Sequence, residues 1–390
     1  MIPQRPVHVL HVCLHTDPYD EPGAGDVGGM NVVVRSTAEA MAGDGHRVEV
    51  VTRRAHPDAP PVSTPAPGVR VHRLDVGPPH RVPKGDHEEL IAPFGAQLPG
   101  LPRPDVVHSH HWFSGAAALP VARRWGVPHV QSFHSIAADP TTPLAHGERP
   151  ESPGRLAGEA MLARDSDLVV AVSRAEAATV TERLGGSRVA LAPPGVDTVL
   201  FHPAADDGGY VLVAARLEPL KGIDLAIAAL GAMPAQERPP LVVVGGPTAR
   251  DGGYLEELRA LAAAHGVAAG FPGPQSRPRL AQTMRRARLL LVPSHSETYG
   301  LVALEAAASG VPVVAAASGG LAEAVVDGVT GVLLHDRDPR TWARVVGDLL
   351  RDRARAAALG EGGRRHAVAH TWQRTARRLV GAYRAVLPAA

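Results

Sequence analysis

The sequence is short of cysteine and of aromatic residues. Its single cysteine, Cys13, excludes an intramolecular disulfide framework and a cysteine-rich metal site, and its apolar neighbours indicate a small buried side chain. Aromatic residues make up 4% of the chain, whereas alanine, glycine, proline and arginine are abundant. We attribute that bias to nucleotide composition rather than to function.

An excess of charge of one sign is also lacking, because 40 Lys and Arg residues stand against 39 Asp and Glu residues. The net charge of +1 gives no field that would attract nucleic acid or a membrane surface. No apolar run reaches the roughly 20 residues that a membrane span needs, and the N-terminus leads into a strand pattern without a signal peptide. We therefore expect a cytoplasmic protein with no membrane span and no nucleic-acid partner.

The chain has 390 residues, more than the ~250–300 that one hydrophobic core usually organises, so we expect two domains. A stretch rich in Pro, Gly and Asp, residues 191–209, separates two similar patterns of strands and helices. We predict an N-terminal domain at residues 1–200, a second domain at 201–370 and an amphipathic C-terminal helix at 371–390.

Apolar runs that indicate buried strands alternate with helical stretches in both halves. Examples are HVLHVCLHT (8–16), DVVHSHH (105–111), YVLVAAR (210–216) and PLVVVGG (240–246). Their apolarity is continuous rather than alternating, which is typical of parallel strands covered on both faces. The pattern predicts an α/β protein with a parallel sheet.

A glycine-rich loop follows the first of these strands and precedes a helix predicted from about Met30 to Ala42. Strand, glycine loop and helix form the phosphate cradle of nucleotide-binding α/β units, although GDVGGMN does not match the dinucleotide fingerprint. The Gly28–Gly29 pair would let the backbone approach a ligand closely at the start of the helix.

Several polar residues fall at or just beyond the carboxyl ends of predicted strands, where open α/β sheets bind ligands. They are His15, Asn31, His108, His110, His111 and His134. The HSHH segment alternates between the faces of a strand and offers no helical i, i+4 pair, so we predict no metal site. We expect one or two of these histidines to form hydrogen bonds with a ligand.

Two cations, Arg216 and Lys221, lie at and just after the end of the first strand of the second half. Such a pair can neutralise a diphosphate, with Arg acting as a fork and Lys as a point charge. The alternative is a pair of solvated surface cations.

A strand, a helix and a second strand are predicted between residues 292 and 320. Gly300 allows a sharp turn before the helix at 301–309, which leaves the N–H groups of residues 298–301 unpaired and suited to a phosphate. Glu297 and Glu305 flank this helix start and could accept hydrogen bonds from sugar hydroxyls. The segment therefore resembles a holder for a sugar nucleotide, although a helix with acidic residues near its positive end remains an alternative.

These segments together resemble the family 4 retaining glycosyltransferases, which have the GT-B fold. The likeness rests on GGMN, RLEPLK, PPGVD, HSETYGLVALEAAASGVPVV and the C-terminal TW helix, and it extends over essentially the whole chain. It implies two Rossmann-like, doubly wound domains that face a cleft, with the C-terminal helix crossing back onto the N-terminal domain.

The resemblance implies a nucleotide-sugar donor, with UDP-N-acetylglucosamine as the first expectation, and chemistry that needs no cofactor or metal. Arg216 and Lys221 would bind the donor diphosphate, whereas Glu297 and His134 would contact the donor sugar near the reacting carbon. These four are the implied catalytic residues. Further donor-binding residues are Gly28, Gly29, Thr298, Tyr299, Gly300, Leu301 and Glu305, the last through the ribose hydroxyls.

For the acceptor, GDVGGMNVVV, VVHSHHWFSG and ERPESPGR resemble the branch of the family that acts on inositol phosphate. The implied acceptor-binding residues are Asn31, Lys84, His111, Ser135 and Arg155. His111 replaces a usual Tyr, Ser135 replaces a usual Thr, and a Lys-Asn pair is missing after HSIA. Because these departures all concern the acceptor, an aminocyclitol or a small thiol such as ergothioneine, glycosylated from another nucleotide sugar, stays an alternative to a small anionic acceptor.

Rival classes remain beside a glycosyltransferase. A glycoside hydrolase uses two carboxylates and binds no diphosphate, so Arg216 and Lys221 would have no role in its reaction. A sugar-nucleotide epimerase would act on the donor without an acceptor, and a non-catalytic binding protein would never release nucleoside diphosphate. The oligomeric state is open, and a homodimer is among the alternatives.

Overall fold

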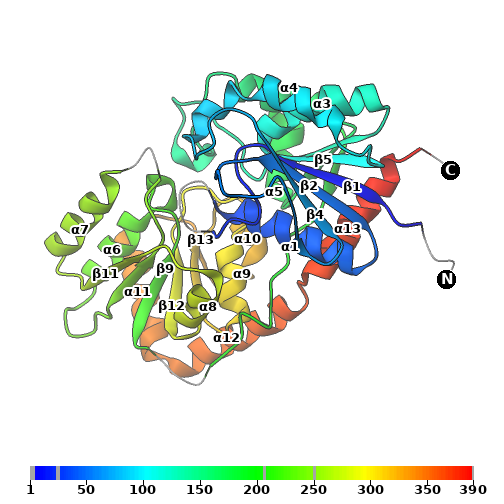
Figure 1. The fold of residues 1–390 in the computed structure, drawn as a ribbon. Coiled ribbons are helices and arrows are strands. Elements are labelled where there is room, and N and C mark those ends of the chain that lie inside the picture. The colour runs from blue at the N-terminus through cyan, green and yellow to red at the C-terminus, as the bar shows by residue number, and fades with distance from the viewer. Residues whose placement is uncertain (1–4, 23–26, 205–207, 249–251, 389–390) are drawn as a thin grey trace.

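A computed structural model describes residues 5–22, 27–204, 208–248 and 252–388. Within these ranges the chain forms an eight-stranded and a six-stranded sheet, one in each half of the molecule (Figure 1). Helices cover both faces of each sheet, which confirms the predicted pair of Rossmann-like units. Residues 23–26 of the predicted glycine loop and residues 205–207 of the predicted linker lie outside the described residues.

The first sheet has the strand order β3-β4-β2-β1-β5-β6-β7-β8, and only β3 runs antiparallel to its neighbour among these strands. The strands are β1 (His8–Cys13), β2 (Arg47–Arg53), β3 (Val62–Ala66), β4 (Val69–Leu74), β5 (Val106–His110), β6 (His129–Ser132), β7 (Leu168–Ala171) and β8 (Val189–Leu191). The edge strands β3 and β8 were not expected from the sequence. Both are short and largely unburied, so neither carries a long apolar run.

Two layers of helices enclose this sheet. Helix α1 packs on one face together with the C-terminal helix, and α2, α3 and α4 cover the other. The elements are α1 (Gly29–Gly43), η1 (Lys84–Glu88), α2 (Ile91–Gln97), η2 (Leu98–Gly100), α3 (His111–Trp125), η3 (Leu144–His146), α4 (Arg155–Asp165), α5 (Arg174–Ala178) and the π-helical turn η4 (Thr179–Arg183). Helix α3 ends because Gly126 adopts a left-handed conformation with φ +63°.

The second sheet is parallel throughout, in the order β11-β10-β9-β12-β13-β14. Its strands are β9 (Tyr210–Ala214), β10 (Leu241–Val244), β11 (Ala269–Gly273), β12 (Ala287–Val292), β13 (Val313–Ala316) and β14 (Gly331–Leu334). Strand order reverses between β9 and β12. In open parallel sheets such a reversal opens a crevice for a ligand at the carboxyl ends of the strands.

The crevice forms because the connections after β9 and β12 lead to opposite faces of the sheet. Helices α6, α7 and α11 pack on one face, and α8, α9, α10 and α12 pack on the other. The helices of this half are η5 (Pro219–Lys221), α6 (Ile223–Gly231), α7 (Tyr254–Ala264), α8 (Arg277–Arg285), α9 (Leu301–Ala308), α10 (Leu321–Ala324), α11 (Pro339–Arg351) and α12 (Arg353–Val368).

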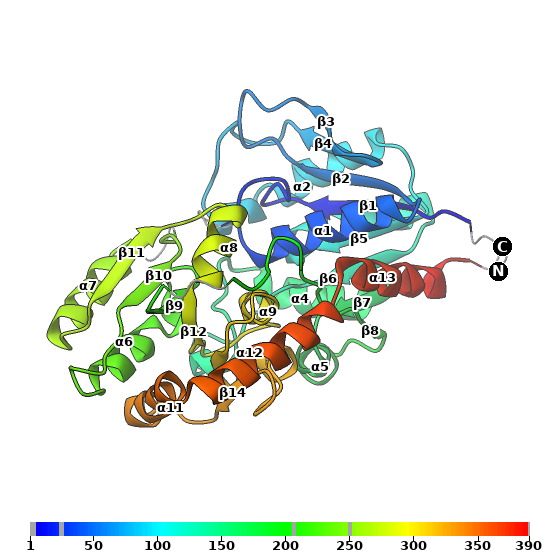
Figure 2. The ribbon, with the colours of Figure 1, turned by 90° about the horizontal axis from the view of Figure 1, so that it is seen from below.

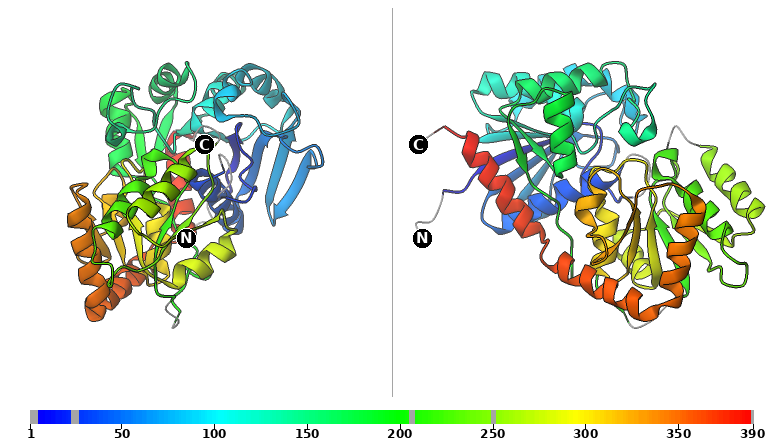
Figure 3. Two further views of the ribbon diagram at one scale, coloured as in Figure 1. Left: turned by 90° about the vertical axis from the view of Figure 1, so that its left-hand side faces the viewer. Right: turned by 180° about the vertical axis from the view of Figure 1, so that it is seen from behind.

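The C-terminal helix α13 (Trp372–Val386) returns to the first half, as the resemblance implied (Figures 2 and 3). The Thr371 side chain caps it by accepting the Arg374 N–H, and its apolar face packs on α1 and β7. Trp372, Leu379 and Tyr383 are buried there, which confirms the predicted amphipathic face. The domain limits at residues 200 and 371 stay predictions.

Among the described helices, none has both the length and the apolarity needed to span a bilayer.

Candidate active site

A cavity of about 350 Å³ lies between the two halves and is lined by both. It opens where the strand order of each sheet reverses, between β1 and β5 in the first half and between β9 and β12 in the second. Segments that follow these four strands line it, which is the ligand-binding position of open α/β sheets. Two parallel sheets therefore present their ligand-binding edges to one shared space.

The N-terminus of α9 forms one wall. Gly300 has φ +104°, a left-handed conformation that favours glycine, and it turns the chain into the helix. The N–H groups of residues 298–301 have no hydrogen-bond partner within the described part of the chain, as the sequence predicted. The turn at Gly319 and Gly320 packs beneath this loop so closely that a Cβ on either would lie about 2 Å from a backbone oxygen of residues 297–298. Residues 298–301 all line the cavity, and the packing of this turn holds their loop in place.

The N-terminus of α1 faces α9 from the other half. Gly28 and Gly29 both line the cavity, and a Cβ on Gly29 would lie 3.3 Å from Leu301 Cδ1. Glycine thus lets the two helix starts approach each other. Because each helix N-terminus carries partial positive charge, the space between them suits an anion such as a diphosphate.

Arg216 and Lys221 also line the cavity, from the segment after β9. Arg216 Nη2 lies 3.0 Å from Glu218 Oε1, and Lys221 Nζ lies 2.6 Å from Glu297 Oε2. Lys221 and Glu297, 76 positions apart, therefore meet as an ion pair at the crevice. The partner Glu218 lies within RLEPLK but was not singled out from the sequence. An incoming diphosphate can exchange for these carboxylates as the partner of either cation.

Glu305 lines the cavity from α9 and is 4% exposed. Arg277 at the start of α8 donates to Glu305 Oε1 over 2.6 Å and lies over the Phe201 ring, 4.7 Å from its centroid. Arg277, which also lines the cavity, was missed because nothing in its neighbouring letters marks it as different from a surface arginine. It therefore holds one carboxylate oxygen of Glu305.

His134 follows β6 and lies where the halves touch. Its backbone has φ +62°, and Thr298 Oγ1 donates to its carbonyl oxygen over 2.8 Å, which joins the loops of the two halves. Burial lowers the pKa of His134 to about 4, so the ring is neutral near pH 7. Its Nε2 pairs with His110 Nδ1, which leaves Nδ1 as the ring nitrogen for a ligand.

The predicted acceptor residues separate into two groups. Lys84, His111 and Ser135 line the cavity, whereas Asn31 and Arg155 do not. The Asn31 side chain accepts from Gly28 N–H and donates to Thr16 Oγ1 and the Asp17 carbonyl, so its polar atoms hold the loop before α1.

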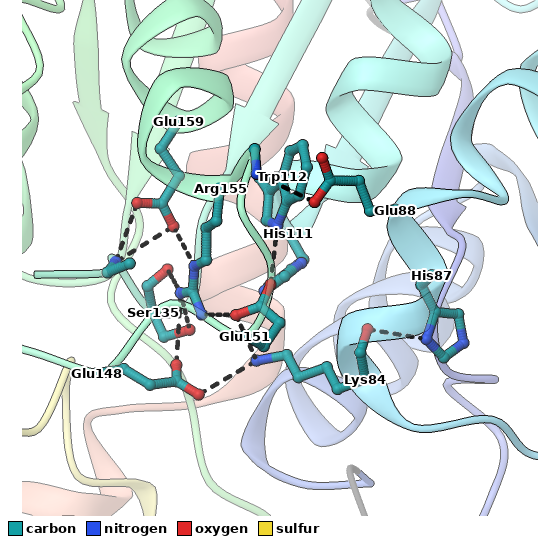
Figure 4. A network of polar contacts seen from close by, with 12 residues as sticks. Lys84, His87, Glu88, His111, Trp112, Ser135, Glu148, Glu151, Arg155 and Glu159 are labelled. Atoms are coloured by element: carbon teal, nitrogen blue, oxygen red, sulfur yellow. Dashed lines mark hydrogen bonds and ion pairs between the residues drawn. The ribbon is translucent and has the colours of Figure 1, made fainter. Parts of the chain in front are cut away.

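Arg155 is completely buried at the start of α4 and is surrounded by carboxylates (Figure 4). Its Nε donates to Glu159 over 2.8 Å, its Nη1 pairs with Glu151, and its Nη2 lies 3.4 Å from Glu148. Nη2 also donates to the Ser135 hydroxyl over 3.0 Å. Arg155 therefore reaches the cavity only through the residues that it holds.

Glu148 completes this wall, and sequence reasoning missed it. It lines the cavity and accepts from Lys84 Nζ over 3.2 Å. Burial raises the pKa of Glu148, but Lys84, Arg155 and Arg216 together bring it well below its usual range. The contribution of Arg216 comes from the opposite half, so Glu148 faces the donor side of the cavity as well.

His111 is the other residue of the described chain, besides His134, that has a positive φ without being glycine, at +68°. Its two ring nitrogens have no hydrogen-bond partner within the described residues, and Nε2 lies 3.8 Å from Glu151 Oε1. Burial, followed by Lys84, His15 and Arg155, lowers the pKa of His111 well below its ordinary value. Strained backbone and unsatisfied polar atoms at one cavity-lining residue are typical of a binding site.

Behind the cavity, His11, His108 and His110 form a buried group whose ligand atoms lie within 4.8 Å of one another. The HSHH segment alone predicts no metal site, but His108 and His110 share one face of β5 and His11 joins them from the adjacent strand β1. By distance the group could hold a cation.

Comparison with known proteins agrees with this architecture. The family model described as "Family 4 Glycosyltransferase in conflict systems" matches residues 21–379. A D-inositol 3-phosphate glycosyltransferase of Stackebrandtia nassauensis is 39% identical over 406 aligned positions, covering 97% of this chain and 91% of that protein. One of the same name from Acidothermus cellulolyticus is 38% identical and covers 99% and 92%.

Solved structures show the same fold. A sucrose-phosphate synthase of Thermosynechococcus elongatus superposes with a TM-score of 0.87 at 28% identity, covering 97% of this chain and 98% of that one. HepE of Anabaena in complex with UDP-glucose gives 0.74 at 19% identity, with coverage of 97% and 100%. With relatives near 39% identity along almost its whole length, the chain belongs to the nucleotide-sugar-dependent, retaining glycosyltransferases of family 4 and has the GT-B fold.

Proposed function

We propose that this glycosyltransferase transfers N-acetylglucosamine from UDP-N-acetylglucosamine to a small polar acceptor, with inositol phosphate as the first candidate. Relatives that are 37–39% identical are named for an inositol 3-phosphate acceptor. Two HepE structures contain UDP or UDP-glucose, which favours uridine in the donor of this chain.

One observation carries the proposal. The α1 and α9 N-termini and the cations Arg216 and Lys221 all line the cavity whose other wall holds Lys84, Ser135 and Glu148. An anionic diphosphate fits the first set of groups and a polar acceptor fits the second. The two substrates would therefore meet beside His134, where the halves touch.

The proposed reaction breaks the bond between the anomeric carbon and the diphosphate oxygen. Arg216, Lys221 and the N–H groups of residues 298–301 stabilise the charge that develops on the leaving diphosphate. A leaving oxygen accepts the proton of the acceptor hydroxyl, and that hydroxyl oxygen bonds to the anomeric carbon on the same face. The configuration is retained, and no residue of the chain needs to form a covalent intermediate.

His134 then serves as a hydrogen-bonding group for the donor sugar rather than as a base. Its pKa of about 4 leaves it a poor proton acceptor compared with a diphosphate oxygen in the transition state. Glu297 would hold a sugar hydroxyl once the diphosphate has taken Lys221 from it.

A second acceptor class is favoured by the charges of the acceptor wall. Three carboxylates, of Glu148, Glu151 and Glu159, surround the two cations Lys84 and Arg155. Of these groups, Glu148 and Lys84 line the cavity, and Glu148 offers a carboxylate to an acceptor that carries a cation, such as an aminocyclitol or a betaine-type thiol.

A panel assay tests the proposal. The purified protein is incubated with UDP- and GDP-sugars, each with inositol 3-phosphate, an aminocyclitol, ergothioneine or no acceptor, and product masses are recorded. We expect UDP release that depends on an acceptor and a product carrying one added N-acetylhexosamine with retained configuration. Conversion of the donor without an acceptor would instead indicate an epimerase, and donor binding without turnover in any arm would contradict the proposed transfer.

A further inference from the structure

Three histidines form a hydrogen-bonded row that runs from the cavity into the protein. His134 Nε2 lies 2.8 Å from His110 Nδ1, and His110 Nε2 lies 2.9 Å from His11 Nδ1. The row leads from the cavity through β5 to β1, and His110 and His11 are 2% and 0% exposed. At its inner end His11 Nε2 is buried and has no hydrogen-bond partner within the described residues.

All three rings are neutral near pH 7. Burial lowers the pKa of His134 to about 4, and burial with a smaller contribution from His134 lowers that of His11 to about 3. The pKa of His110 lies well below its ordinary value, because of burial and then of the neighbouring histidines. Each ring therefore carries one N–H and one lone pair.

Neutral rings in this row allow two arrangements of protons. If His110 carries its proton on Nδ1, then His11 and His134 carry theirs on Nδ1 as well. If His110 carries it on Nε2, all three protons move to Nε2. The tautomer at the buried end thus sets the tautomer at the cavity, because every link needs one donor and one acceptor.

The two arrangements differ in what they leave unpaired at His11. The first leaves a lone pair on Nε2, whereas the second leaves an N–H group without an acceptor. Buried N–H groups without an acceptor are rarer in folded proteins than under-used acceptors. We propose that His11 and His110 are positioning residues that hold the proton of His134 on Nδ1, so that His134 offers an N–H to an oxygen of the donor sugar.

The backbone of His134 is fixed as well as its ring. Thr298 Oγ1 donates to the His134 carbonyl over 2.8 Å, and His134 keeps its φ of +62° in that contact. The Nδ1–H group therefore has a defined direction before a donor arrives. Only the identity of the sugar oxygen rests on the proposed function, since the tautomer is a property of the protein alone.

The alternative is a metal ion bound by His11, His108 and His110, and the hydrogen bonds of His108 argue against it. Ser132 Oγ donates to the Val170 carbonyl, so it accepts from His108 Nε2, and His108 Nδ1 in turn accepts the Tyr383 hydroxyl proton. That assignment gives every proton an acceptor and occupies both nitrogens of His108. Of the nitrogens in this group, His11 Nε2 alone has no hydrogen-bond partner within the described residues, which is too few for a zinc site.

Nitrogen-15 NMR of histidine-labelled protein tests the proposal, because the shifts of Nδ1 and Nε2 report which nitrogen carries the proton. We expect the wild-type His134 to be protonated on Nδ1. His11→Phe should give a mixture of tautomers at His134 and reduce kcat/KM for the donor by about tenfold, the size of one hydrogen bond. His11→Asn, which can still donate to His110 Nε2, should restore the tautomer and most of the activity, and exposed His56→Phe should change neither.

A wild-type His134 protonated on Nε2 would overturn the proposal, and so would an unchanged tautomer in folded His11→Phe. Stoichiometric zinc, measured by elemental analysis of the wild-type protein and lost in His11→Phe, would overturn it too. The wild-type spectrum requires no variant to fold. If the panel assay shows no transfer while His134 carries its proton on Nδ1, the proposed function fails and the histidine row stands.

Discussion

The two walls of the cleft hold their charges in different ways. On the second half, Arg216 lies beside Glu218 and Lys221 lies beside Glu297, and all four side chains are partly exposed, by 12–26%. On the first half, Arg155 is completely buried among three carboxylates. An ion pair that reaches solvent contributes little stability and can give way to another partner, whereas the fully buried Arg155 depends on each of its carboxylates. The second-half wall with Arg216 and Lys221 can therefore accept an anion, and we call it the receiving wall. The first-half wall with Arg155 and its carboxylates depends on buried contacts for its shape, and we call it the shape-keeping wall.

The largest expected effect is on the free energy of unfolding and follows from removing Arg155 from its buried ion pairs. Arg155→Met leaves Glu148, Glu151 and Glu159 without their shared cation, and removal of one partner from a buried ion pair costs about 3–5 kcal/mol. We expect urea unfolding to show that loss in the free energy of unfolding. Arg164→Met, an exposed position on the same helix, should leave it within about 0.5 kcal/mol.

A double variant distinguishes stability lost through uncompensated charge from stability lost through poorer packing of the Met side chain. Adding Glu159→Gln to Arg155→Met removes one uncompensated charge and should recover part of the lost stability. If Arg155→Met has the same free energy of unfolding as the wild type, the buried ion pairs of Arg155 do not stabilise this wall.

The next largest effect concerns catalysis and the receiving wall. Arg216→Ala removes a cation from the developing charge of the leaving diphosphate, and loss of one such stabilising group lowers turnover by roughly 10²–10³-fold. Stability should barely change, because Arg216 is partly exposed. Initial rates of UDP release and circular dichroism measure the two properties.

Exposed Arg259→Ala on α7 is the matched control and should leave both properties unchanged. If Arg216→Ala turns over at the wild-type rate, Arg216 does not stabilise the leaving diphosphate. The proposed difference in role between the two walls would then be wrong.

A third prediction concerns pH and Glu176, a buried residue of α5 that holds the backbone of the cavity-lining residue Val172. Burial raises the pKa of Glu176, next to β7, to about 7, although its carboxylate accepts the Val172 N–H over 2.7 Å. Because its folded pKa lies above the unfolded value of 4.5, its contribution to stability is complete below pH 4.5 and is lost as pH rises toward and past 7. Each pKa unit corresponds to about 1.4 kcal/mol, so the shift from 4.5 to about 7 predicts a loss of roughly 3–3.5 kcal/mol in the free energy of unfolding.

Urea unfolding between pH 4.5 and 8 measures this loss. Glu176→Gln should flatten the pH profile, whereas exposed Glu182→Gln should not. A wild-type profile that is already flat would mean that Glu176 titrates normally and that its surroundings are wetter than its burial indicates.

The contrast between the walls also explains what could be predicted from the sequence. Glu297, the residue 298–301 amides and Glu305 belong to one strand, loop and helix, so their spacing alone places them together. Glu148, Arg277 and His11 gain their importance from partners 28 to 99 positions away, namely Lys84, Glu305 and His110. Local patterns do not encode such pairs. The parallel sheets were predictable from their apolar runs, but the short edge strands β3 and β8 were not.

The smallest effect should reveal which acceptor the shape-keeping wall selects. Glu148→Gln removes a negative charge that lies 3.2 Å from Lys84 Nζ and 3.4 Å from Arg155 Nη2, at the edge of the cavity. An anionic acceptor would then meet a freer Lys84, and we expect its KM to fall by roughly 3–10-fold with kcat little changed. For an acceptor that carries a cation, the same substitution should raise KM by a similar factor.

Kinetics with inositol 3-phosphate and with an aminocyclitol distinguish the two acceptor classes, with exposed Glu89→Gln as the control. If neither KM moves, the Glu148 charge does not face the acceptor, and the three-carboxylate wall acts only through the positions of Ser135 and Lys84.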